Sequence, residues 1–84
     1  MSRELLLYTR PGCTLCEDLL AAARPVIDRH GVGVRKVNID RDPDLRDRYG
    51  HDIPVLMLDD DRGCREVCRH HLDVEALEHA LAGE

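Results

Sequence analysis

Apolar residues form continuous runs at some places in the chain and an alternating pattern at others. The runs Leu5–Tyr8 and Ile53–Leu58 predict strands covered on both faces, as in the middle of an α/β sheet. The segment Val34–Ile39 alternates imperfectly, which predicts an edge strand or a strand with a bulge. Residues 64–68 follow the polar turn 59–63 and predict a fourth strand that pairs as a hairpin.

Helical spacing and capping signals predict three helices between and after these strands. The longest runs from Thr14 to about His30. Pro25 lies inside it and predicts a kink or a split, because a proline in a helix interior costs about 3 kcal/mol. A short helix is expected over residues 42–49, and Asp73 is expected to cap a last amphipathic helix.

The predicted order of elements is βαβαββα. A crossover through one helix makes the first two strands parallel, and the connection between them is expected to be right-handed. The predicted fold class is therefore α/β, a four-stranded mixed sheet flanked by helices in three layers. The length of 84 residues predicts one domain spanning residues 1–84.

Composition narrows the classes of function. The formal net charge is -5 and the basic residues are scattered among acidic ones, which argues against a nucleic-acid partner. The chain has no long apolar stretch, so no membrane span is expected. Residues 1–9 lack the layout of a secretory signal, and we expect a cytoplasmic protein that acts as a monomer.

Two cysteines, Cys13 and Cys16, stand where the first strand ends and the long helix begins, just after Pro11-Gly12. Backbone N–H groups and the helix dipole at a helix start stabilise thiolate over thiol, which makes Cys13 the candidate nucleophile. Residues three apart on a helix lie roughly 5 to 6 Å apart, so Cys16 can close a disulfide with Cys13 as the resolving thiol.

Charges beside these cysteines act in opposite directions. Arg10 adds positive charge before the turn, whereas Glu17 and Asp18 add negative charge after Cys16. The sequence therefore leaves the sign of their combined effect on the thiolate open.

Other interpretations of the four cysteines have to be weighed. Cys13 and Cys16 could be small buried hydrophobic residues, or two ligands of a zinc module completed by the segment from Cys64 to His71. On a strand, however, Cys64 and Cys68 would lie about 13 Å apart, too far for one disulfide or one tetrahedral ion. The favoured interpretation of these two is a pair of small residues on one strand face, with His70 and His71 in a loop.

Pro54 at the start of a buried strand has two interpretations. It could simply mark the edge of the strand, where a missing N–H is tolerated. Alternatively, the Ile53–Pro54 bond is cis, a form confined essentially to prolines, and turns an exposed N–H and C=O of Ile53 toward an extended substrate. His51 lies nearby and could approach the thiolate, although a solvated loop position is favoured for it.

The segment Tyr8-Thr9-Arg10-Pro11-Gly12-Cys13-Thr14-Leu15-Cys16 resembles the active-site segment of glutaredoxins. Asn38-Ile39-Asp40, followed by Tyr49-Gly50-His51-Asp52-Ile53-Pro54, resembles the cis-proline region of thioredoxins. The resemblance covers nearly the whole chain and is greatest to compact bacterial glutaredoxin-like proteins. It implies a thioredoxin-like fold.

The resemblance also implies residue roles. It makes Cys13 the nucleophile, Cys16 the resolving cysteine, and Ile53 with Pro54 a binding site for the substrate backbone. Residues around the cysteines are expected to contact substrate as well, namely Arg10, Gly12, Thr14 and Leu15. In glutaredoxins a glycine pair before the last helix lets its N-terminus hold a glutathione carboxylate. Here His70 and His71 take those positions, and Asp73 would compete with the anion as a cap.

The function implied is a thiol:disulfide oxidoreductase. Its substrate would be a disulfide-containing protein or a glutathione mixed disulfide, and glutathione or a reductase would supply electrons. No metal or prosthetic group is expected, with glutathione as a possible co-substrate. Two alternatives remain: a non-catalytic redox-sensing adaptor of the same fold, which would show no turnover, and the zinc module, which would lose its fold on chelation.

Overall fold

The computed structural model describes residues 3–82 and has the predicted order βαβαββα. Its elements are β1 (Glu4–Thr9), α1 (Thr14–His30), β2 (Gly33–Asn38), the short 3-10 helix η1 (Ile39–Arg41), α2 (Pro43–Tyr49), β3 (Val55–Asp60), β4 (Gly63–Arg69) and α3 (Val74–Leu81). Within the described residues, none of these helices has the length and apolar character that a bilayer crossing requires.

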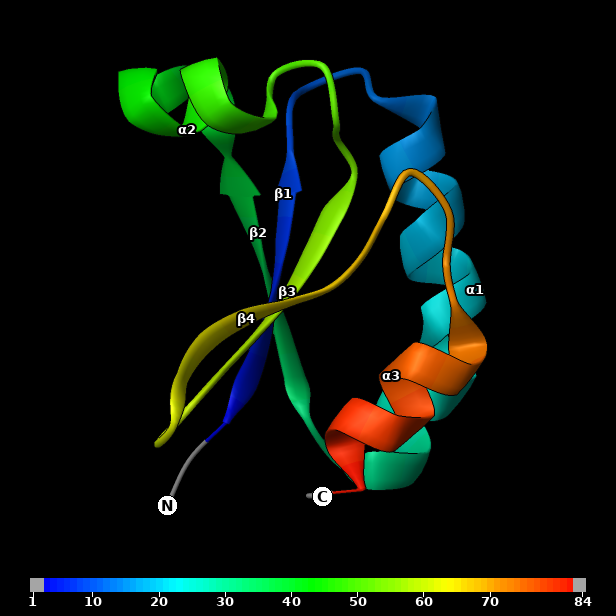
Figure 1. Cartoon of the computed structure of the whole chain (residues 1–84). Coiled ribbons are helices and arrows are strands. Elements are labelled where there is room, and N and C mark those ends of the chain that lie inside the picture. The colour runs from blue at the N-terminus through cyan, green and yellow to red at the C-terminus, as the bar shows by residue number, and fades with distance from the viewer. Residues whose placement is uncertain (1–2, 83–84) are drawn as a thin grey trace.

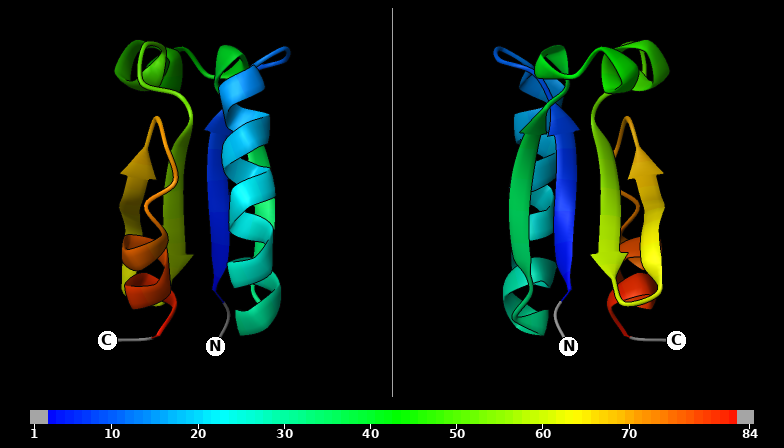
Figure 2. Two further views of the ribbon diagram at one scale, coloured as in Figure 1. Left: turned by 90° about the vertical axis from the view of Figure 1, so that its right-hand side faces the viewer. Right: turned by 90° about the vertical axis from the view of Figure 1, so that its left-hand side faces the viewer.

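The four strands form one mixed sheet in the order β2-β1-β3-β4. β1 pairs with β2 in parallel and with β3 antiparallel, and β3 pairs with β4 antiparallel. β2 is an edge strand, as its imperfect alternation predicts. Helices α1 and α3 lie along one face of the sheet, and α2 lies at the end of the sheet where β1 finishes (Figures 1 and 2). The predicted α/β class is confirmed.

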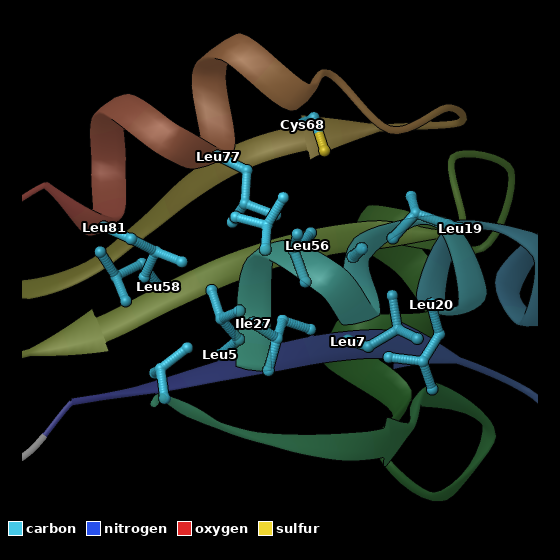
Figure 3. Packing of buried hydrophobic residues seen from close by; sticks show 13 residues of the cluster. Leu5, Leu7, Leu19, Leu20, Ile27, Leu56, Leu58, Cys68, Leu77 and Leu81 are labelled. Atoms are coloured by element: carbon cyan, nitrogen blue, oxygen red, sulfur yellow. The ribbon is translucent and has the colours of Figure 1, made fainter. Parts of the chain in front are cut away.

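β1 is buried on both faces because its four central residues are all apolar. Leu5 and Leu7 belong to the larger core beneath α1 and α3, whereas Leu6 and Tyr8 belong to a smaller core on the opposite face. Figure 3 shows the larger core, in which leucines from β1, β3, α1 and α3 meet between the sheet and the helices. The continuous apolar run is thus correctly interpreted as a central strand.

Of the two outcomes predicted at Pro25, a kink or a split, the split is absent, because helix α1 runs without a break from Thr14 to His30. Pro25 is exposed, so the carbonyl that loses its helical partner can be hydrated by solvent. The apolar residues Leu19, Ala23 and Ile27 on the inner face of the helix are buried and hold it against the sheet on both sides of the proline. The predicted split is therefore wrong.

Strand β4 contains a bulge that the sequence does not reveal. Leu56 pairs with Cys68 while the next residue, Met57, pairs with Glu66, so Val67 is inserted between them. Because one extra residue reverses the facing of all later positions, Cys68 joins the core beneath α1 and α3 and Cys64 lies across from Asp59 on the other face. The expectation that Cys64 and Cys68 share one strand face is wrong.

Candidate active site

The turn between β1 and α1 is built by Arg10-Pro11-Gly12-Cys13. The N–H of Cys13 donates to the carbonyl of Arg10 at 3.3 Å, which closes a four-residue turn. Gly12 has a φ of 82°, the left-handed value that the third position of a type II turn requires, and Pro11 occupies the preferred second position. This turn places Cys13 at the start of α1.

Cys13 is the N-cap residue of α1, one position earlier than the first helical turn. Its Sγ accepts a hydrogen bond from the N–H of Cys16 at 3.2 Å, so a free backbone donor of the helix start points at the sulfur. The two cysteines are joined as a disulfide, with their Cα atoms 5.3 Å apart. The predicted pairing geometry is therefore present.

The two sulfur-bearing residues differ in exposure. Cys13 is half-buried, whereas Cys16 is only 1% exposed. A substrate can therefore approach Cys13 but not Cys16. Thr14 is also exposed, and Leu15, between the cysteines, is 57% exposed, a high value for a large apolar side chain.

Arg10 points away from the turn to a distant segment. Its guanidinium contacts Asp40 of η1, with Nε at 3.3 Å and Nη2 at 3.1 Å from Oδ1. Its Nη1 donates to the carbonyl of Gly50 at 3.5 Å. Arg10 is therefore neutralised by a carboxylate 30 residues away, a contact that no spacing in the sequence indicates.

A second ion pair lies on the other side of the turn. Glu17, in the first turn of α1, pairs with Lys36 of β2 at 3.2 Å. Between the two pairs lies a hollow of about 240 Å³, lined by Thr9, Arg10, Pro11, Gly12, Glu17, Lys36 and Asn38. Sequence analysis identified Arg10 and Glu17 as opposing charges but missed their partners.

The Ile53–Pro54 segment lies at the same end of the sheet as the start of α1 (Figure 1). Its peptide bond is cis and Pro54 is buried. The N–H of Ile53 donates to the carbonyl of Tyr49 at 3.2 Å, and the carbonyl of Pro54 accepts from the N–H of His70 at 2.8 Å. The expectation of an exposed Ile53 N–H is thus wrong, because that donor closes the turn after α2.

The N-terminus of α3 is capped by the side chain of Asp73, which accepts from the N–H of Ala76 at 3.0 Å. The predicted cap is therefore present, whereas its competition with an anion stays a prediction. His70 contacts Asp52 at 3.4 Å, and His51 and His71 are exposed.

Cys64 and Cys68 take no part in a disulfide. Burial raises the pKa of the Cys68 thiol, and partial burial beside Asp59 raises that of Cys64. Across residues 3–82, no three His, Cys, Asp or Glu side chains gather closely enough to hold a metal ion. The zinc module of the sequence analysis therefore gains no support.

Comparison with known proteins bears on this geometry. Residues 4–82 match the family described as "Glutaredoxin-like domain (DUF836)". The chain belongs to this glutaredoxin-like family. A relative from Dictyostelium discoideum, "Glutaredoxin-like protein YDR286C homolog", is 24% identical over 95% of this chain and 76% of its own length.

Solved structures place the glutaredoxin-like domain among thioredoxin folds. Protein Ne2328 from Nitrosomonas europaea superposes with a TM-score of 0.83 at 29% identity, covering 95% of this chain and 92% of that one. Mitochondrial thioredoxin 3 from Saccharomyces cerevisiae, in its oxidized form, has a TM-score of 0.71 at 15% identity, with 99% and 79% covered. The second likeness shows the fold alone, and it agrees with the predicted thioredoxin-like architecture.

Proposed function

We propose that this glutaredoxin-like domain is a thiol:disulfide oxidoreductase, with Cys13 as nucleophile and Cys16 as resolving thiol. The observation that carries the proposal is the unequal exposure of two bonded cysteines at a helix start, with Cys13 half-buried and Cys16 1% exposed. A thiolate at an N-cap position faces backbone N–H groups, which favour the ionised form. The buried partner cannot meet a bulky substrate directly.

The proposed reaction has two exchange steps. The Cys13 thiolate attacks one sulfur of the substrate disulfide, forms a mixed disulfide with it, and releases the other substrate sulfur as a thiolate. Cys16, deprotonated, then attacks Cys13 Sγ, forms the Cys13–Cys16 disulfide and releases the second substrate thiolate. The substrate gains two electrons and the dithiol loses two. Thiol–disulfide exchange of this kind needs no metal or prosthetic group.

Substrate contacts are proposed for the surface around Cys13. Leu15 and Thr14 are exposed beside it, and Gly12 forms the turn that precedes it. At the Ile53–Pro54 loop the N–H of Ile53 is engaged, so we assign substrate-backbone binding to the Ile53 carbonyl. The proposed substrate is a protein disulfide or a glutathione mixed disulfide, and glutathione or a reductase in the cytoplasm restores the dithiol.

A trapping experiment tests the nucleophile. We expect the Cys16→Ser variant, reduced and mixed with glutathione disulfide, to accumulate a mixed disulfide on Cys13 because the second step is blocked. Mass spectrometry of the intact chain and of its peptides locates the adduct. The experiment is best done with Cys64→Ser in the background, because the exposed thiol of Cys64 could also react with glutathione disulfide.

The matched control is Cys13→Ser in the same Cys64→Ser background. It is expected to form no adduct, because Cys16 is buried. An adduct on Cys16 in this control, or none on Cys13 in the Cys16→Ser variant, contradicts the assignment. A native chain that oxidises reversibly yet shows no turnover in a reductase assay contradicts the enzymatic part and favours the sensor alternative.

A further inference from the structure

The charged side chains nearest in sequence to Cys13 belong to the two residues that hydrogen-bond to its backbone. The carbonyl of Arg10 accepts from the N–H of Cys13, and the N–H of Glu17 donates to the carbonyl of Cys13, each at 3.3 Å. One residue carries positive charge and the other negative charge. Two residues of opposite charge are thus joined to Cys13 through its backbone.

Each of these charges has a partner from the segment Lys36–Asp40. Lys36 of β2 pairs with Glu17, and Asp40 of η1 pairs with Arg10. β2 is parallel to β1, so Lys36 lies opposite Leu7 near the end of β1, and Asp40 follows the end of β2 in η1. The segment Lys36–Asp40 therefore supplies the ion-pair partners of both Arg10 and Glu17.

We propose that Asp40 and Lys36 are positioning residues that tune the reactivity of Cys13 in opposite directions. Asp40 holds Arg10 and offsets its positive charge, which limits thiolate formation. Lys36 holds Glu17 and offsets its negative charge, which favours thiolate formation. The inference rests on the proposed function, since it concerns the reactivity of the same thiol.

Other charged groups around the site have the same charge in the native chain and in variants at positions 36 and 40. Asp18 on α1 is exposed, Asp52 before Pro54 is paired with Arg69 and His70, and His51 is exposed. None of them contacts Arg10 or Glu17 in the described part of the chain. Substitutions at positions 36 and 40 therefore leave these groups in place.

The expected size of the shift in the pH midpoint of Cys13 follows from the solvent exposure of the two ion pairs. Side chains of both pairs are between 36% and 68% exposed, so solvent screens them. A unit charge about 8 to 10 Å from a titrating group in water shifts its midpoint by roughly 0.3 to 0.4 pH units. We expect shifts of about that size at low salt and their loss at about 1 M salt, where the Debye length is ~3 Å.

The experiment measures the alkylation rate of Cys13 by iodoacetamide against pH in the reduced full-length chain, at about 10 mM salt. Asp40→Asn is expected to lower the pH midpoint by about 0.2 to 0.5 units, and Lys36→Gln to raise it by a similar amount. The matched controls are Asp28→Asn and Arg24→Gln on exposed positions of α1, more than ten residues from Cys13, with expected shifts of less than half that size.

A double-mutant cycle separates the route through Arg10 from a direct effect of Asp40. In an Arg10→Gln background the shift caused by Asp40→Asn is expected to shrink by at least half. An undiminished shift overturns the positioning role. Shifts of the same sign for Asp40→Asn and Lys36→Gln, or shifts no larger than the controls, also overturn the proposal, since general loosening of the site would produce one sign only.

Failure of this inference is distinguishable from failure of the proposed function, because the midpoint is measured without a disulfide substrate. Opposite shifts in a chain that exchanges no disulfide would refute the function and support the tuning. Normal disulfide exchange without such shifts would refute the tuning and leave the function supported.

Discussion

Among the glycines of the described residues, Gly50 has the least room for a side chain. A methyl group there would lie 2.5 Å from the carbonyl oxygen of Arg46 and 3.7 Å from the guanidinium of Arg10. Its own carbonyl accepts from Arg10. Gly50 therefore lets the end of α2 pass close to Arg10, the first residue of the active-site turn.

Substituting Gly50→Ala is expected to destabilise the fold by about 1 to 3 kcal/mol, because backbone atoms of Arg46 have to move. Urea unfolding followed by circular dichroism measures the loss. Gly33→Ala is the matched control, since nothing lies within 4 Å of a methyl group there, and we expect a change within about 0.5 kcal/mol. Equal losses at the two positions would contradict the close approach at Gly50.

At the scale of single residues, the sequence predicts those features that depend only on neighbouring residues in the chain. Pro11-Gly12 before Cys13 is a turn signal that needs no tertiary information, and the structure contains the corresponding turn. The contact of Arg10 with Asp40 depends on how β2 pairs with β1 and how η1 continues from it, so no local pattern reveals it. Likewise, the engaged N–H of Ile53 depends on the turn after α2.

Helix α3 shows how a cap fixes the beginning of an element. Asp73 caps it as the sequence predicts, through a hydrogen bond to the N–H of Ala76. The inner residues Leu77 and Leu81 are buried in the larger core. The helix is short, from Val74 to Leu81, so its end contributes a large part of its hydrogen bonding.

Removing the cap with Asp73→Ala is expected to cost about 1 kcal/mol of unfolding free energy. Glu75→Ala is the control, because it removes a negative charge from the same first turn without removing a cap, and it is expected to cost about 0.3 kcal/mol. Thermal or urea unfolding compares the two variants. A Glu75→Ala loss as large as that of Asp73→Ala would show that charge, and not the cap, stabilises the helix start.

Whole elements follow from the sequence better than their details do. Every predicted strand and helix is present, but β2 stops at Asn38, whose side chain accepts from the N–H of Asp40 and starts η1. Pro25 leaves α1 unbroken because it faces solvent while buried residues hold the helix on either side. The bulge at Val67 is invisible in the apolar pattern, since it depends on pairing with β3.

For the whole molecule, the sheet order and the placement of helices follow from which strands are apolar on both faces. β1 and β3 are central for that reason, and β2 and β4, with many exposed charged residues, lie at the edges. The same arrangement distributes the four cysteines to different depths. Cys13 is half-buried at the helix start, Cys16 and Cys68 are buried, and Cys64 is exposed on the edge strand.

The proposed function requires Cys13 to be the most reactive of these four thiols, and competitive alkylation tests this requirement directly. The reduced chain is treated with limiting iodoacetamide near pH 7, and labelling at each cysteine is counted by mass spectrometry. Cys13 is expected to react about tenfold faster than Cys64, because backbone N–H groups favour its thiolate, whereas partial burial and Asp59 raise the pKa of Cys64. Labelling of Cys64 at an equal or faster rate would contradict the account.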